Sequence, residues 1–336
     1  MNKKKLIIII VASGILILGA ILLLQNISSM DSKVDNKYVE KEDNYSLEEL
    51  TIVNEKSDSR VYAVSIDNVD SALPQAGINS SYLTYEVIVE GGLTRFLALF
   101  KDANLDKIGP VRSARHYFLD YAFENDAILV HYGQSYIAEE DIKTTKIENM
   151  NGVLVGQYFY RENDRQSPHN AYTSYNLITK YTKKYEQTKE SDLLLNYSIA
   201  DINLDNGEVA NNVVINYPNN EVVYEYDSVN RLYNRFQNGK KQVDQLTGKQ
   251  IFAENIIIQK VKNYNYTEGT VYQSLDNIGN GKGIYITNGK YKEITWKKNT
   301  RKGKTTYKYL DGKEIEVNDG KTFINIQPIN YRYDIN

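Results

Sequence analysis

The sequence predicts an α+β fold, in which an α/β-like N-terminal domain with a central sheet precedes a β-rich C-terminal domain. Between residues 60 and 130, a strand pattern, a helical pattern and a second strand pattern follow one another. From about residue 209, short runs rich in aromatic and β-branched residues alternate with Asn-Gly and Asp-Gly pairs, which favour hairpin turns. We therefore place the N-terminal domain at residues 60–205 and the C-terminal domain at residues 206–336.

Strands and a tight turn open the predicted N-terminal domain. Residues 60–66 form an apolar strand pattern that ends at Asp67. Residues 82–89 and 94–100 are rich in aromatic and β-branched residues. The Gly-Gly pair between them fits a two-residue hairpin, because both turn positions need positive φ.

A helix and a further strand follow the hairpin. Pro110 suits the first position of a helix, and apolar residues recur at helical spacing to about Glu124. Residues 127–130 then form a short buried strand, with His131 just beyond it. A second helical pattern at residues 174–190 closes the domain.

The chain opens with an apolar segment that is long enough to cross a membrane. Residues 6–24 carry no charge, and three lysines stand in residues 1–5. About 20 apolar residues span a bilayer as a helix, and the positive-inside rule keeps the lysines in the cytoplasm. The sequence therefore predicts a cytoplasmic tail, a transmembrane anchor at residues 6–24 and a body outside the cytoplasm, at the cell membrane. A cleaved signal peptide is the alternative.

Composition narrows the chemistry. The chain has no cysteine, which excludes disulfides, thiol catalysis, cysteine metal sites and lipid attachment through an N-terminal cysteine. Its histidines, at positions 116, 131 and 169, match no zinc spacing, so we expect neither a metal nor a cofactor. Residues 25–59 are polar and charged, as in a flexible tether. Nucleic acid is not an expected partner outside the cytoplasm.

Two carboxylates lie in the otherwise apolar strand at residues 82–89. Glu86 and Glu90 share one face of the strand, and a two-residue turn would place Arg95 opposite Ile88, on that same face. This predicts a row of Glu, Arg and Glu. The two carboxylates would lie roughly 13 Å apart, too far for a standard glycosidase pair, which needs about 5 to 9.5 Å.

Glu90 is the preferred candidate for a lone general acid. It borders a Gly-Gly turn, where a bare backbone lets a ligand approach. The alternative is a partly buried ion pair that determines the register of the hairpin.

Arginines and polar strand ends supply further candidates. Arg112 and Arg115 stand near the start of the predicted helix, where a carboxylate, a phosphate or a sugar-lactyl group would be held. The alternative is that they pair with carboxylates of the protein itself. Asp67 and His131 each follow a strand, and ligands of open α/β sheets bind beyond such ends if the strands are parallel.

A polar loop and a basic stretch complete the candidates. The loop at residues 160–172 has little apolar content and carries charged groups, of which Asp164 or His169 would transfer protons. The alternative for His169 is solvent exposure or a hydrogen bond within a turn. Residues 282–308 are strongly basic, which suits an anionic wall polymer or lipid headgroups, unless they are only the solvated face of a hairpin.

Several short motifs together resemble one known family. They are Glu90-Gly91-Gly92, the run Ile-Gly-Pro-Val-Arg-Ser-Ala-Arg at residues 108–115, Asp164-Arg165, Pro168-His169-Asn170 and Trp296-Lys297-Lys298. From about residue 60 to the end, the chain resembles the YerB-like envelope protein family of Gram-positive bacteria, which has two adjoining domains and no settled reaction. The resemblance implies a lipoprotein, yet the lipid-accepting cysteine is missing, and Phe323 stands where tryptophan is expected.

These features predict a membrane-anchored envelope protein that cleaves peptidoglycan glycan strands in the manner of a lytic transglycosylase. Glu90 would protonate the glycosidic oxygen, and Glu86 or Asp67 would have a positioning or stabilising role. The substrate-binding candidates are Arg95, Arg112, Arg115, His131, Arg161, Asp164, Arg165, His169 and Asn170. The alternative is a non-catalytic wall-binding or regulatory module that binds glycan or a cell-wall enzyme.

Overall fold

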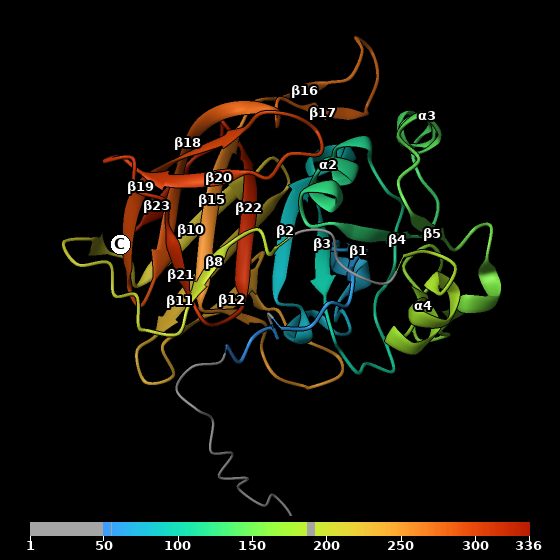
Figure 1. The fold of residues 1–336 in the computed structure, drawn as a ribbon, viewed down its shortest axis with the longest axis horizontal. Coiled ribbons are helices and arrows are strands. Elements are labelled where there is room, and N and C mark those ends of the chain that lie inside the picture. Colours follow the sequence, from blue (N-terminus) through green and yellow to red (C-terminus); the bar gives the residue numbers. More distant parts are fainter. Residues whose placement is uncertain (1–49, 55, 187–191) are drawn as a thin grey trace, which may run out of the picture. The chain divides into compact units, whose positions relative to one another are not determined.

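An eleven-stranded sheet runs through the part of the chain that the computed structural model describes, which is residues 50–54, 56–186 and 192–336 (Figure 1). From edge to edge the order is β20 (Thr306–Tyr309), β19 (Lys290–Lys298), β18 (Gly279–Thr287), β15 (Asn255–Val261), β22 (Thr322–Pro328), β2 (Leu83–Ile88), β3 (Thr94–Phe100), β1 (Val61–Asp67), β4 (Ala127–His131) and β5 (Asn149–Asn151), and β9 (Glu208–Val209) pairs with β19. The sheet therefore contains strands from both predicted domains, whose boundaries stay a prediction.

The remaining strands form smaller sheets. A six-stranded sheet has the order β13 (Lys240–Lys241), β12 (Leu232–Gln237), β11 (Asn220–Asp227), β10 (Asn212–Tyr217) and β23 (Tyr333–Ile335), with β14 (Phe252–Ala253) on β12. Three pairs stand apart: β16 (Asn263–Asn265) with β17 (Gln273–Leu275), β21 (Glu316–Asn318) with β8 (Asn196–Ser198), and β6 (Tyr160–Arg161) with β7 (Ala171–Tyr172).

Both faces of the large sheet are covered, which explains why its central strands are apolar throughout rather than alternating. On one face, side chains such as Ala63 pack with residues of α2 (His116–Glu124), including Phe118. On the other face, side chains such as Val64 belong to a second core with residues of the six-stranded sheet, including Val213.

The predicted α+β class is wrong, because the described residues form a mostly β structure. Their three α-helices are short: α2 has nine residues, α3 (Tyr136–Thr145) ten and α4 (Tyr175–Thr182) eight. Single 3₁₀ turns lie at Asp70–Ala72, Ile78–Ser80, Glu90–Gly92 and Gly156–Tyr158.

The helix predicted from Pro110 begins only at His116. Residues 111–114 are held extended by neighbouring segments, since Val111 N–H donates to Ala171 and Arg112 N–H donates to Ser65. In a helix that began at Pro110, these two N–H groups would lie in the first turn and would have no acceptor within the helix. Helical spacing of apolar residues was therefore overridden by backbone pairing with distant segments.

The register of the β2–β3 hairpin also differs from the prediction. Val89 pairs with Leu93, since the Val89 N–H donates to the Leu93 carbonyl, whereas the prediction paired Glu90 with Leu93. The turn therefore has three residues, Glu90–Gly92. Arg95 therefore lies opposite Val87. A shift of one residue moves a side chain to the other face of a sheet, so the predicted row of Glu, Arg and Glu does not form.

The described helices are all short. The longest described helix, α3, has ten residues, whereas a bilayer crossing takes about 20. Within the described ranges, no helix is long and apolar enough to cross a membrane. The predicted tail (1–5) and anchor (6–24) lie outside the described residues. Of the predicted tether, Thr51 and Ile52 hydrogen-bond the Asp319 carboxylate.

Candidate functional site

Polar side chains converge where parallel strands of the large sheet end. β1 runs parallel to β4, and β4 runs parallel to β5, so Asp67 and His131 lie at the same end of these strands, as the prediction required. Asp67 is 1% exposed. Its Oδ2 lies 2.9 Å from Arg112 Nε and 2.7 Å from His169 Nδ1. The structure thus joins candidates from three separate segments.

A second ion pair lies beside this group. Arg115 Nε donates to Glu90 Oε1 at 2.6 Å, and its Nη2 contacts Glu90 Oε2, which makes the pair two-pronged. Both side chains are partly exposed. Burial raises the pKa of the Glu90 carboxyl, but the hydrogen bond and charge of Arg115 outweigh burial and hold that pKa below its ordinary value.

Arg95 lies between the two ion pairs and has no carboxylate partner within the described residues. It is 5% exposed and stands opposite Asp67 in the β1–β3 register. Its Nη1 donates to Ser113 O at 2.5 Å, and its Nε is buried with no hydrogen-bond partner. Burial and the nearby charge of Arg115 lower the pKa of Arg95 to about 9. We call Arg95, Arg112 and Arg115 the arginine cluster.

The segment that carries two of these arginines is held in place by its backbone. Arg112 N–H donates to Ser65, and Arg115 Nη1 reaches Ser113 O at 3.3 Å, the carbonyl that Arg95 also contacts. Gly109 precedes the segment with φ +147°, and a Cβ there would lie 2.9 Å from the ring of Tyr172. Glycine is thus required for the close approach that positions the cluster.

Glu86 is not part of this group. It lies on the opposite face of the sheet from Arg95, is fully buried, and pairs with Arg235 of β12 at 2.6 Å. Its other carboxylate oxygen accepts hydrogen bonds from Thr94, Asn68 and Asn220. Glu86 therefore joins the two sheets in the interior.

His131 is also held by the protein. Its Nδ1 lies 2.8 Å from Gly133 O and its Nε2 lies 3.2 Å from Asn149 Oδ1. The side chain is 0% exposed, and burial lowers its pKa. These contacts hold the His131 side chain in place at the end of β4.

The loop candidates mostly contact one another. Arg161 Nη1 donates to Asn170 Oδ1 at 2.6 Å, and Arg165 Nη2 lies 2.9 Å from Asp164. Of these loop residues, His169 is the one with a contact to Asp67.

Aromatic residues near the arginine cluster were missed at the level of sequence. Tyr136 is 55% exposed and Tyr266 is 42% exposed. The ring of Tyr266 lies near His116, which directly follows Arg115, and the ring of Tyr136 lies near Tyr266. Tyrosine is common in strands of this chain and was interpreted as packing. The signal was the placement of Tyr266 in a polar turn, outside any apolar pattern. Trp296, by contrast, is buried.

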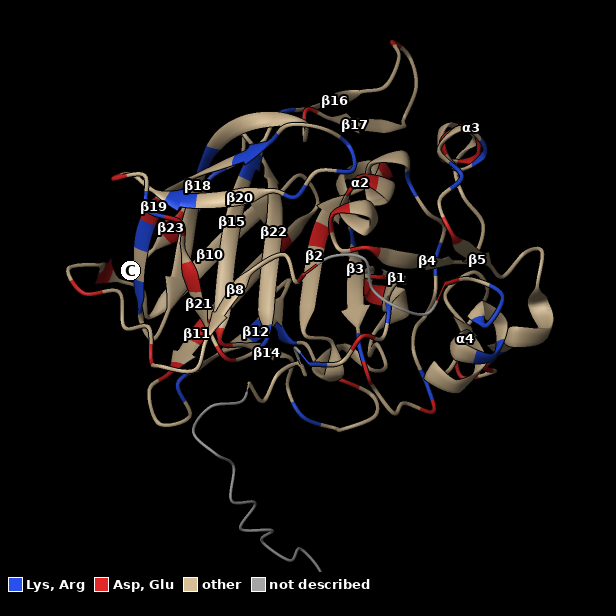
Figure 2. Ribbon diagram, in the orientation of Figure 1, with Lys and Arg blue, Asp and Glu red and all other residues tan. Residues whose placement is uncertain are grey.

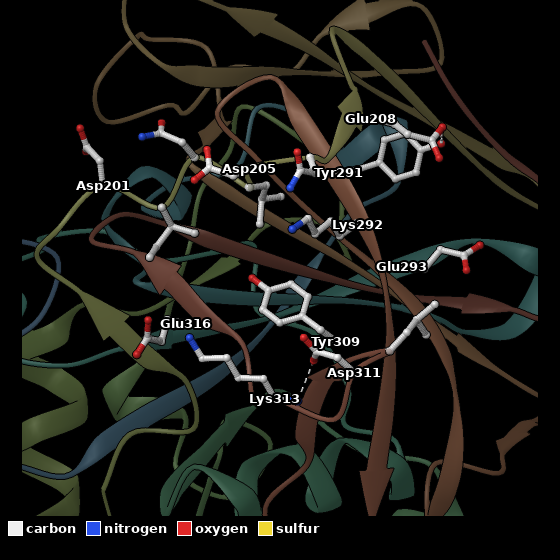
Figure 3. A pocket seen from close by; sticks show the side chains of 15 residues that line it. Asp201, Asp205, Glu208, Tyr291, Lys292, Glu293, Tyr309, Asp311, Lys313 and Glu316 are labelled. Carbon is white, nitrogen blue, oxygen red and sulfur yellow. Dashed lines mark hydrogen bonds between the residues drawn. The ribbon is translucent and has the colours of Figure 1, made fainter.

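Charged residues also gather elsewhere in the described part of the chain. Figure 2 shows basic residues on β18, β19 and β20, the predicted basic stretch, although its Lys298 is buried against Glu124. A cavity of about 670 Å³ lies in the C-terminal half (Figure 3), and its lining includes the six carboxylates Asp201, Asp205, Glu208, Glu293, Asp311 and Glu316. Within the described ranges, no three or more His, Cys, Asp or Glu side chains are placed so that together they could hold a metal ion.

Comparisons with known proteins agree on one family. Residues 49–189 match the model described as protein of unknown function (DUF3048), N-terminal domain, and residues 213–324 match the corresponding C-terminal domain. A relative in Bacillus subtilis (strain 168), named "Putative lipoprotein YerB", is 33% identical over 279 residues, which are 81% of this chain and 82% of the relative.

The fold is similar to a solved structure as well. The crystal structure of YerB protein from Bacillus subtilis matches with a TM-score of 0.75 and 30% identity, over 85% of this chain and 99% of that one. The relative's name describes a lipid-anchored protein. This name disagrees with the predicted single-pass localisation with the N-terminus in the cytoplasm, which is corrected on that ground.

Proposed function

Because the chain belongs to the DUF3048 family and is homologous to YerB, we propose that it is a non-catalytic binding protein of the cell envelope. Its arginine cluster holds an anionic group of the cell-wall peptidoglycan. The observation that carries this proposal is the buried charge of Arg95, which makes no direct ion pair with a carboxylate of the described residues.

The charge balance of the site supports an anionic ligand. A buried cation costs several kcal/mol unless it is paired, on the order of the effective desolvation penalty in proteins. Asp67 is already paired with Arg112, and Glu90 with Arg115. Guanidinium groups bind carboxylates through two parallel hydrogen bonds, and Arg95 has an unused Nε. A carboxylate of the ligand would give Arg95 the hydrogen-bond acceptor that it lacks.

Cleavage of glycan strands has less support. A general acid must carry a proton near the working pH, so its pKa is normally raised. Arg115 holds the pKa of Glu90 below its ordinary value. Glu86 is sealed inside the protein against Arg235. The paired arginine and glutamate suit binding better than proton transfer.

Co-sedimentation with purified peptidoglycan tests the proposal. The full-length protein should pellet with peptidoglycan, and Arg95→Gln should reduce the affinity about tenfold, the loss of roughly 1.4 kcal/mol. Peptidoglycan whose carboxyl groups have been amidated should bind the wild type as weakly. Arg231→Gln, which removes an exposed ion pair with Asp201, is the matched control and should bind normally.

Two results would overturn the proposal. One is equal binding by wild type and a folded Arg95→Gln variant. The other is catalysis: mass spectrometry of the soluble products would then find anhydro-muropeptides that disappear with Glu90→Gln.

A further inference from the structure

Three exposed or half-buried tyrosines form a surface next to the arginine cluster. They are Tyr136 at the start of α3, and Tyr266 and Tyr272 in the β16–β17 hairpin, and we call them the tyrosine patch. Tyr136 is 55% exposed and Tyr266 is 42% exposed, while Tyr272 is half-buried. Grouped exposed aromatic rings on a soluble surface commonly mark a binding site.

The rings of the patch are held in fixed relation. Tyr136 and Tyr272 have ring centroids 5.2 Å apart at 84°, and Tyr136 and Tyr266 are 6.5 Å apart at 85°. Tyr266 N–H donates to Tyr272 O at 2.7 Å, which closes the hairpin. In Figure 1 the β16–β17 hairpin lies above α2, and α3 lies to the right of α2. In edge-to-face packing the edge of one ring meets one face of the other, so the pairing itself does not cover both faces of either ring.

His116 joins the patch to the arginine cluster. Its ring lies 5.5 Å from that of Tyr266 at 66°, and its Nε2 lies 3.5 Å from Ser274 Oγ in β17. Its Nδ1 is buried and has no hydrogen-bond partner among the described residues. His116 directly follows Arg115, and Tyr272 is close enough to contribute to the raised pKa of Arg115, so the patch lies next to the cluster.

We infer that the tyrosine patch binds the sugar rings of an acidic glycan strand while the arginine cluster holds the strand's carboxylate. This inference rests on the proposed function and names its ligand class. Sugar rings present apolar C–H faces and hydroxyl edges, and tyrosine has an apolar face and a polar tip that match both. Tyrosine also loses little conformational entropy on binding. The adjacent excess of positive charge favours a glycan that carries carboxylates.

Calorimetry with two glycans tests both parts of the surface. The acidic ligand is peptidoglycan glycan strands freed of peptides, which keep the lactyl carboxylates, and the neutral ligand is a chitin oligosaccharide. Tyr136→Ala with Tyr266→Ala should weaken binding of both about tenfold, as for aromatic residues that carry binding energy. Arg95→Gln should weaken the acidic strand alone. Tyr331→Ala, which removes another exposed tyrosine, should leave both unchanged.

The failures are distinguishable. If the tyrosine variant binds both glycans like the wild type while Arg95→Gln loses the acidic strand, the inference fails and the proposed function stands. If the tyrosine variant loses both glycans while Arg95→Gln binds normally, the proposed function fails. Absence of neutral-glycan binding by the wild type at millimolar concentration would also overturn the inference, and would leave a protein partner as the occupant of the patch. Circular dichroism must show that each variant is folded.

Discussion

Glu86 and Arg235 form an ion pair of 2.6 Å, although they are 149 positions apart in the sequence and neither side chain is exposed. The Arg235 guanidinium also lies 5.0 Å from the ring centroid of Phe96. The pair links β2 of the large sheet to β12 of the six-stranded sheet, so it ties the two halves of the chain together.

Breaking this pair should strongly destabilise the fold. Glu86→Ala leaves Arg235 buried without its carboxylate, and such changes cost about 3–5 kcal/mol. Urea unfolding should show this loss, whereas Glu86→Gln combined with Arg235→Met should cost less because no charge is left buried. The exposed pair of Arg231 and Asp201 is the reference, and Arg231→Met should cost below about 1 kcal/mol. A loss for Glu86→Ala as small as that would contradict the prediction.

The two glycines of the β2–β3 turn should differ in their tolerance of a side chain. Both have positive φ, +71° for Gly91 and +70° for Gly92. A Cβ at Gly92 would lie 2.5 Å from Pro218 Cβ, whereas at Gly91 the nearest atom is 4.0 Å away. Gly92→Ala should therefore cost about 1–3 kcal/mol more than Gly91→Ala in thermal or urea unfolding. Equal costs would show that Pro218 moves aside freely.

His116 should make stability depend on pH in the acid range. Burial, helped by the charges of Arg301 and Arg115 and opposed by those of Asp141 and Glu90, lowers its pKa to about 4. In the unfolded chain the pKa is near 6.5. Between these values the unfolded state binds more protons, so stability falls as pH drops from 6.5 to 4.

Urea unfolding of wild type and His116→Gln measures this contribution. The wild type should lose more stability than the variant between pH 6.5 and 4, and above pH 7 the two should depend on pH alike. Parallel profiles over the whole range would refute a buried neutral His116.

Glu90→Gln should strengthen anion binding. The variant frees Arg115 from its carboxylate and raises the net positive charge of the arginine cluster. Partly exposed ion pairs contribute up to about 1 kcal/mol, so affinity for acidic glycan strands should rise by roughly fivefold. Calorimetry in low and high salt checks this, since the gain should shrink as salt screens it. Weaker binding would instead place Glu90 in contact with the ligand as a hydrogen-bond acceptor.

Local pattern by itself determined much about this protein. Aromatic and β-branched runs predicted the strands that became β1, β2, β3 and β4, because such side chains favour an extended backbone wherever they are buried. Sequence motifs identified the family. The end of the first strand selected Asp67, the hairpin selected Arg95, and the start of the predicted helix selected Arg112 and Arg115, which the structure brings together.

Tertiary structure alone decided the rest. The β2–β3 turn took one more residue than its Gly-Gly pair implied, which sent Glu86 into the interior and Arg95 to the arginine cluster. β22 pairs with both β2 and β15, so strands more than 200 positions apart share one sheet. Register and such distant pairing depend on which faces become buried, and a local pattern carries no information about the partner that buries them.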